Sequence, residues 1–192
     1  MNYKNQYVLS EEDIKEAADY VPIADKVAFV SEVSMRCFNK LEITAEGTEA
    51  QGIAMPPMYS ENTELKSRYL MGAFVKMYLK KDIEPCEGEN WLLSRDDYDR
   101  WAGHHIFNQV ERLKQGTSAE CKNKCFDIIQ DYKDLEKRLS TEIYGQLQVM
   151  NDVCHRLRMM IEEGSTPEAM QDAMRQLGDL KKELESYTRK VE

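Results

Sequence analysis

The longest uninterrupted helical signal lies in the last third of the sequence, and it restricts the fold more than any other feature. Thr117-Ser118-Ala119-Glu120 has the form of a helix capping box, in which the Glu120 side chain reaches back to the capping residue. No proline follows until Pro167, and apolar residues recur at steps of three and four, the spacing of one helix face. If unbroken, this helix spans roughly 118–163, about 69 Å at ~1.5 Å rise per residue.

The apolar repeat of this long helix changes near its middle. It alternates steps of three and four up to Leu139, then takes two steps of four to Leu147 before the alternation resumes. Gly145 lies inside this stutter, where it costs about 1 kcal/mol relative to alanine in a helix. The sequence leaves open whether the helix is continuous or kinked between Ser140 and Gly145.

A second helix is expected after a clear stop signal. Gly164 is the favoured residue just after a helix C-terminus, and Pro167 suits the first turn of the next helix. The apolar residues that follow form a strict heptad seam of the coiled-coil type: Met170, Ala173, Leu177, Leu180, Leu184, Tyr187 and Val191. Residues 117–192 are therefore predicted to form a long, coiled-coil-like antiparallel helical hairpin.

The expected return helix, about 167–191, is too short to cover all of the first one. It can pair only with residues 140–163, so the apolar face of residues 121–139 must be buried elsewhere. Burial of Ile128, Leu135 and Leu139 against a second chain would contribute about 1.5–3 kcal/mol each. We therefore expect a homodimer through these three residues. The alternative is that residues 69–79 cover the same face within one chain.

The first 116 residues are predicted to form a helical bundle, so the whole chain is expected to be all-α. Residues 69–79 carry a single charge, and we expect residues 63–81 to form a buried central helix. Capping serines begin two further helices, Ser10 to about residue 20 and Ser94 to about residue 115.

The region around the first prolines has mixed signals. Pro22 can open a helix to about residue 40, with a core face that contains Ile23, Val27, Val30, Ser34, Cys37 and Phe38. Residues 41–62 are the weakest part of the chain for helix, because apolar and polar residues alternate there and glycines flank a polar turn. A short β-hairpin at 41–55 is compatible with this pattern, followed by an extended connector at Pro56-Pro57.

Composition and charge narrow the class of protein. With 42% hydrophobic and 32% charged residues, the chain is expected to be a soluble globular protein. It contains no apolar run near the ~20 residues that span a bilayer and no signal peptide, so a cytoplasmic location is predicted. The net charge is −9 and basic residues do not cluster beyond pairs, which disfavours direct binding to nucleic acid.

The acids are concentrated in one stretch, from Asp82 to Asp99, which holds a single base, Arg95. An acidic loop with an aromatic centre could dock on a basic protein surface or imitate nucleic-acid phosphates. A solvated loop beside a helix N-terminus is the plainer interpretation. The residues predicted to bind a partner are Asp82, Glu84, Glu87, Glu89, Trp91, Asp96 and Asp99.

Candidate metal and catalytic residues are few. Cys121 and Cys125 are one helical turn apart, but with Cys154 they occupy seam positions, where a free cysteine acts as a small hydrophobe. His104 and His105 follow three acids, yet His105 lies on an apolar helix face, which is typical of a core histidine. Five scattered cysteines do not form a disulfide framework. We therefore expect no metal, no cofactor and no catalytic residue.

These observations favour a non-enzymatic protein–protein interaction or assembly protein that uses the helical hairpin and the acidic loop. The alternative is an acidic inhibitor of the kind encoded by phages and mobile elements, which would mimic nucleic acid and block a nucleic-acid-binding partner. The third hypothesis is an enzyme that uses the region of His104 and His105. The sequence does not identify the partner.

Overall fold

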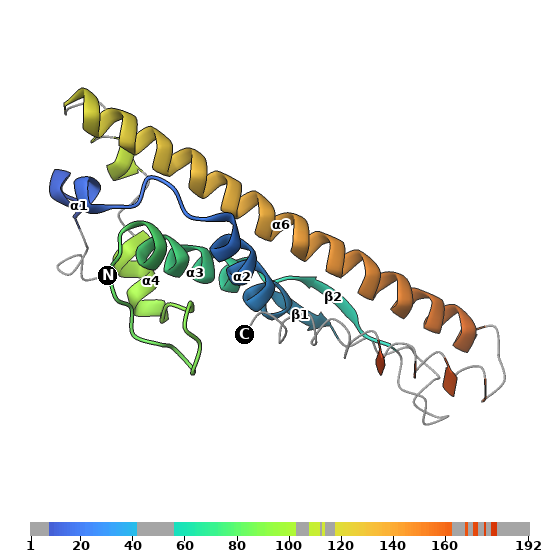
Figure 1. The fold of residues 1–192 in the computed structure, drawn as a ribbon. Helices are drawn as coiled ribbons and strands as arrows, with labels where there is room; N and C mark the ends of the chain where they lie inside the picture. Colours follow the sequence, from blue (N-terminus) through green and yellow to red (C-terminus); the bar gives the residue numbers. More distant parts are fainter. Residues whose placement is uncertain are drawn as a thin grey trace. The chain divides into compact units, whose positions relative to one another are not determined.

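The computed structural model describes residues 8–41, 56–102, 108–111, 113 and 118–162, and single positions between 168 and 179. Over this part of the chain the protein is mostly helical, with one long helix and a small two-stranded antiparallel sheet, which confirms the helical class (Figure 1). Within the same residues, no helix is both long and apolar enough to cross a membrane. The expected return helix, 167–191, falls outside the described residues apart from those single positions.

The chain divides into two compact units. The first combines Met1–Phe29 with Thr63–Leu139, and the second combines Val30–Asn62 with Ser140–Glu192. The first unit thus contains residues from both sides of position 116. The predicted domains, a bundle at 1–116 and a hairpin at 117–192, stay predictions.

Helix α6 (Ala119–Glu162) is the long helix that the sequence predicts, and it is continuous for 44 residues. It shows no break at Gly145, where an added Cβ would meet nothing within 4 Å. Thr117, the expected first residue of the capping box, lies outside the described residues. Ser118 is the capping residue, and its Oγ accepts a hydrogen bond from the backbone N–H of Cys121 at 3.4 Å.

The seam of α6 in the first unit is buried at the predicted heptad positions. Ile128, Leu135 and Leu139 are each 0% exposed within the single chain. Tyr132, on the same seam, contacts the rings of Phe74 and Tyr78 edge-on at centroid distances of 5.3 and 6.0 Å. A second chain could reach these three residues only if the unit opened, so the structure favours the intramolecular alternative, and the oligomeric state stays a prediction.

The aromatic partners of α6 belong to a helix that changes pitch. Helix α3 (Thr63–Ala73) continues into the π-helical turn η4 (Phe74–Tyr78), which contains one extra residue per turn. Most side chains from Arg68 to Leu79 are buried, as expected for a segment with so few charges. The π turn stacks Phe74 on Tyr78 at 5.6 Å between ring centroids and points both toward Tyr132.

Helix α1 (Glu11–Glu16) begins as predicted but is shorter. Ser10 and Asp13 form a capping box, whereas the expected end near residue 20 was wrong. The chain leaves the helix at Ala17 because the next backbone N–H groups find partners elsewhere. Ala18 donates to the carbonyl of Tyr78 at 2.7 Å, outside the helix.

Helix α2 (Ile23–Val33) also ends earlier than predicted, and its buried face differs from the expected one. The chain passes through the 3₁₀ turn η2 (Ser34–Arg36) into strand β1 (Phe38–Leu41), so the expected helix to residue 40 was wrong. Ile23 and Val27 are 54% and 47% exposed, whereas Lys26 is 1% exposed. The predicted core face is buried at Val30, Ser34 and Cys37, but its first turn was wrong because a buried ion pair holds Lys26 inside.

The second unit contains the sheet, which joins β1 to β2 (Met58–Glu61) in antiparallel register with Phe38 opposite Glu61. Apart from Leu41, its strands lie outside the expected hairpin at 41–55, and residues 42–55 are not among those described. At one residue of β2, the Asn151 side chain makes the pair of hydrogen bonds that a neighbouring strand would make. Its amide group accepts from the Tyr59 N–H and donates to the Tyr59 carbonyl, both at 2.9 Å, which ties β2 to α6.

Candidate functional site

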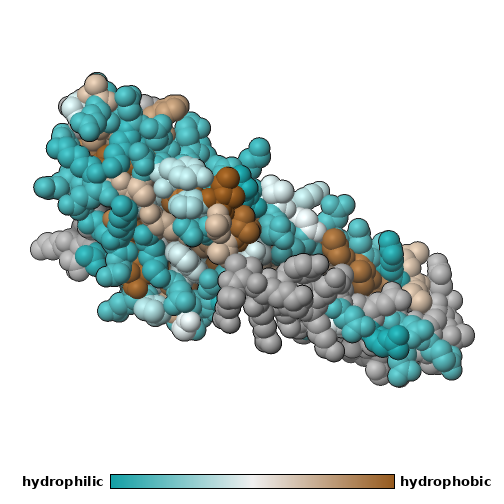
Figure 2. Space-filling model, in the orientation of Figure 1, coloured by the Kyte–Doolittle hydropathy of each residue, from teal (hydrophilic) through white to brown (hydrophobic). Residues whose placement is uncertain are grey.

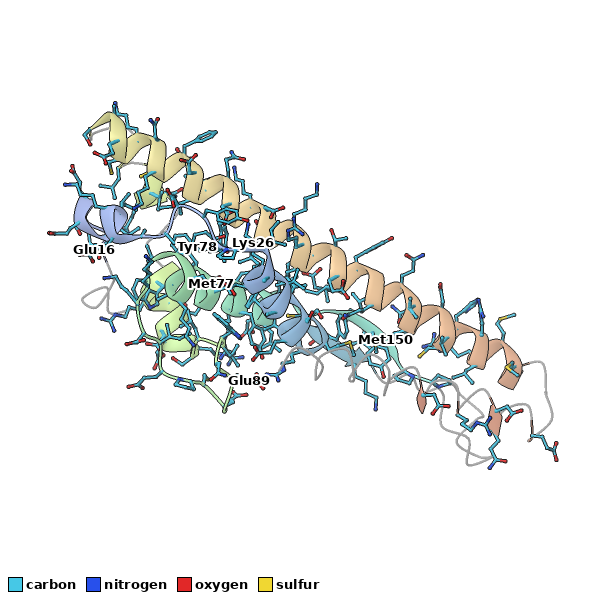
Figure 3. All side chains as sticks on the ribbon, viewed as in Figure 1. Glu16, Lys26, Met77, Tyr78, Glu89 and Met150 are labelled. Carbon is cyan, nitrogen blue, oxygen red and sulfur yellow. The ribbon has the colours of Figure 1, made fainter. Side chains whose placement is uncertain are left out.

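The acidic loop, defined here as residues 82–94, connects η4 to helix α4 (Arg95–Ala102) in the first unit. In Figure 1 it is the green loop beside α4, and Figure 3 labels Glu89 on it. A loop of this length without helix or strand would ordinarily be adaptable. Here four sets of contacts hold it: a turn at its tip, two cation tethers and a close backbone approach.

The tip of the loop is a tight two-residue turn. Glu87 and Gly88 have φ angles of 55° and 79°, and the N–H of Glu89 donates to the carbonyl of Cys86 at 2.9 Å. Positive φ at both central residues defines a type I′ turn, the type that best joins two antiparallel segments. The turn presents the Glu87 carboxylate to solvent.

Arg68 of α3 binds the loop at two points, one near its tip and one near its end. Its side chain is 6% exposed, and its Nε donates to the carbonyl of Leu93 at 2.7 Å. Its Nη2 lies 3.7 Å from the sulfur of Cys86, where the tip begins. A buried guanidinium is stable only with hydrogen-bond partners, so this pairing also stabilises α3.

Trp91 lies against α3 and α2. Its backbone carbonyl crosses Gly72 so closely that a Cβ at that position would overlap it. Its ring meets Phe29 edge-on at 5.4 Å, and Lys76 Nζ lies 4.8 Å from the ring centroid. Lys76 also donates to the carbonyl of Asn90 at 3.1 Å. Trp91 is therefore partly buried as an anchor for the loop.

The loop ends in a capped helix. The N–H of Asp97 donates to Ser94 Oγ at 3.1 Å and Ser94 Oγ donates to the Asp97 carboxylate at 2.7 Å, as the sequence predicted. Arg95, the single base of the acidic stretch, binds Glu64 of α3 at 2.9 Å. It therefore binds a carboxylate outside the acidic stretch.

The predicted partner-binding residues are brought together on this loop and the first turns of α4, and most of their carboxylates face solvent. Five are exposed: Asp82, Glu84, Glu87, Asp96 and Asp99. Glu89 and Trp91 are half-buried. Among the residues that the structure describes, none of the five exposed acids forms an ion pair. The arrangement is a concentrated negative surface on a fixed backbone.

A second charged cluster lies inside the first unit, and sequence reasoning missed it. Lys26 Nζ binds Asp131 Oδ1 of α6 at 2.5 Å, and Asp131 Oδ2 accepts from Tyr78 Oη at 2.9 Å and from the N–H of Val21 at 3.0 Å. Lys26 also binds Asp134 at 3.2 Å. Figure 3 shows Lys26 and Tyr78 close together below α6. The sequence signal for this cluster was a lysine inside an apolar pattern, together with an aspartate beside a seam tyrosine.

This cluster changes the acid–base properties of its members. Burial, followed by the hydrogen bond to Asp131, raises the pKa of Tyr78 far above its ordinary value. The hydrogen bond from Arg138 and the Lys26 ammonium lower the pKa of Asp134. Asp131 has two hydrogen-bond donors and the lysine around it, so its role is to join α2, η4 and α6.

The other candidate residues provide no site within the described chain. Cys121, Cys125 and Cys154 are all buried, as their seam positions predict. Across the described residues, no group of three or more His, Cys, Asp or Glu side chains could hold a metal ion. His104 and His105 lie outside the described residues, so the predictions about them stay predictions.

Comparison with known proteins adds no functional assignment. No protein-family model matches the chain, and no curated protein and no solved structure matches it.

Proposed function

We propose that this protein is a non-enzymatic interaction protein that docks on a basic surface of a partner protein through the acidic loop. The supporting observation is how the loop is held. Arg68 and Lys76 donate to backbone carbonyls and a sulfur of the loop, and not to its carboxylates. Arg95 pairs with Glu64 instead. The scaffold thus fixes the loop through cations that do not pair with its exposed carboxylates, Asp82, Glu84 and Glu87.

A fixed, charged loop suits docking for two energetic reasons. Ordering a flexible side chain at an interface costs about 0.5–1.5 kcal/mol, and a preformed backbone removes the larger share of the ordering cost. Exposed charges of one sign attract a partner of opposite sign, so they raise the association rate and make it fall with salt. The half-buried Trp91 would add an apolar contact at the centre of such an interface.

The assembly part of the proposal concerns the C-terminal third. We propose that residues 167–191 return along the second half of α6 as a coiled-coil-like arm, in a cytoplasmic protein. The heptad seam from Met170 to Val191 supports this arm. Leu177→Asp should then lower the midpoint of thermal unfolding by several degrees, because a buried leucine contributes about 1.5–3 kcal/mol. An unchanged midpoint would contradict the arm.

The docking proposal is tested by removing charge without disturbing the turn. The variant Asp82→Asn/Glu84→Gln/Glu87→Asn removes three exposed carboxylates, and asparagine tolerates the positive φ of position 87. The matched control, Asp127→Asn/Asp152→Asn/Asp179→Asn, removes three exposed carboxylates elsewhere. Each protein is immobilised, and partners captured from source lysate are quantified at low and high salt.

We expect the loop variant to lose the partner that wild type and control both capture, and we expect that capture to weaken with salt. Equal capture by all three proteins would refute docking through the loop. If nucleic acid displaces the captured partner, the alternative of a nucleic-acid mimic replaces the general proposal. The enzyme hypothesis depends on His104 and His105, which lie outside the described residues.

A further inference from the structure

The outward face of α2 has an unusual composition for a surface helix. Tyr20, just before the helix, is 54% exposed, and Ile23 and Val27 one turn apart are 54% and 47% exposed. Ala24 lies exposed beside them. We call these four residues the α2 patch. Figure 2 shows hydrophobic residues gathered in the middle of the visible face, in the region where Figure 1 draws α2.

The α2 patch faces solvent although the same helix carries a lysine, Lys26, that is buried instead. Lys26 is buried against Asp131 while Ile23 and Val27 face outward. Surface helices normally turn their charged residues to solvent and their apolar stripe to the core. Contiguous exposed apolar residues on a soluble domain commonly mark an interaction site.

Carboxylates predominate around the α2 patch. Glu16, Asp19 and Asp25 are exposed, and the cation that follows them, Lys26, is buried and paired, which leaves Lys15 as the exposed cation on this stretch of chain. From the facing helix α6, Arg138 acts on Tyr20 electrostatically, but it is paired with Asp134 at 2.8 Å. Three exposed carboxylates against one exposed lysine therefore give the edges of the patch a net negative charge.

We propose that the α2 patch receives a basic amphipathic helix of a partner protein. Three large apolar side chains fit the anchors of a short helix, which repeat at intervals of three and four residues. They are too few for a stable dimer, which buries ~800 Å² on each partner. A second copy of this chain would also bring the same carboxylates and its own net charge of −9 to the contact. Lysines or arginines flanking the apolar stripe would complement Asp19 and Asp25.

The probe is a fluorescein-labelled synthetic peptide of about 18 residues, with leucines at helical spacing and lysines on both flanks. Its binding to the full-length protein is measured by fluorescence anisotropy at moderate salt. A second peptide with glutamates in place of lysines tests charge. The variant Ile23→Ser/Val27→Ser removes the patch, and Val8→Ser/Val149→Ser removes two exposed valines elsewhere. Circular dichroism checks that each variant is folded.

The lysine peptide should bind wild type and the Val8/Val149 control alike, and the patch variant should bind at least about tenfold more weakly, because interface anchors commonly contribute more than 1 kcal/mol. The glutamate peptide should not bind. Absence of binding to wild type, or retention of binding by the patch variant, would overturn the proposal. So would a dimer in light scattering that the patch variant dissociates, because a second copy would then occupy α2. The patch and the acidic loop use different residues, so each proposal can fail alone.

Discussion

One substitution made at two glycines separates the loop scaffold from general helix stability. Gly72 and Gly145 both lie inside helical segments, where alanine is intrinsically better by about 1 kcal/mol. At Gly145 an added Cβ would meet nothing within 4 Å. At Gly72 it would overlap the carbonyl oxygen of Trp91 and lie 3.0 Å from its carbonyl carbon and 3.4 Å from Ile83 Cδ1.

The loss of stability expected for Gly72→Ala depends on how far the loop backbone at Trp91 has to move. The obstructing atom is backbone, so the loop must shift by on the order of 1 Å to restore normal contact distances. That shift weakens the hydrogen bonds from Arg68 and Lys76, which lie on either side of Trp91. Overpacking of this kind costs about 1–3 kcal/mol. After the intrinsic gain of alanine, we expect Gly72→Ala to destabilise the protein by up to about 2 kcal/mol.

The assay is thermal unfolding followed by circular dichroism, with tryptophan emission recorded on the same samples. Gly72→Ala should lower the midpoint by up to roughly 8 °C and Gly145→Ala should raise it by roughly 2–4 °C. The emission of Trp91 should change only in Gly72→Ala, because its ring would leave Phe29 and Lys76. If both variants are equally stabilised and their emission is that of wild type, Trp91 does not cross α3 at Gly72.

Two further predictions concern the buried cluster. Lys26→Met should destabilise the protein by about 3 kcal/mol, because it leaves the carboxylate of Asp131 without its cation. The exposed control Lys122→Met should change stability little. Urea denaturation of both variants measures the difference, and equal midpoints would show that the ion pair contributes nothing. The raised pKa of Tyr78 favours its neutral form in the folded state, so stability should be constant below the ordinary value of 10.0 and fall as pH rises above it. The urea midpoint followed from about pH 8 to about pH 11 should fall less steeply in Tyr78→Phe than in wild type, and parallel curves would exclude this tyrosine as a source of the alkaline loss.

The sequence predicted the features that depend on local spacing. The heptad of α6, its approximate bounds and the capping serines Ser10 and Ser94 follow from helix geometry and from hydrogen bonds made within a few residues, whereas the sequence left the continuity of α6 at Gly145 open. The buried segment from α3 through η4 was expected from its lack of charge. Such signals are local, so tertiary contacts were not needed to find them.

The predictions failed where distant partners decide the outcome. Helix α1 ends at Glu16 because Ala18 pairs with Tyr78, more than fifty residues away. Helix α2 stops before β1, whose partner strand begins only at Met58. The loop acids were recognised by composition, but the tethers from Arg68 and Lys76 were not, because a charged residue in an apolar helix does not reveal which carbonyl it will bind.

Lys26 and the acidic loop follow one physical rule with opposite results. A cation placed inside the first unit needs carboxylate partners, so Lys26 uses Asp131 and Asp134, and α2 turns Ile23 and Val27 outward. Arg68 and Lys76 instead donate to backbone carbonyls of the loop, so they do not pair with its exposed carboxylates, Asp82, Glu84 and Glu87. Lys26 thus joins core elements, whereas Arg68 and Lys76 hold the backbone of the loop. The groups that remain at the surface are an apolar stripe edged with acids and a fixed acidic loop, and both would attract a basic partner.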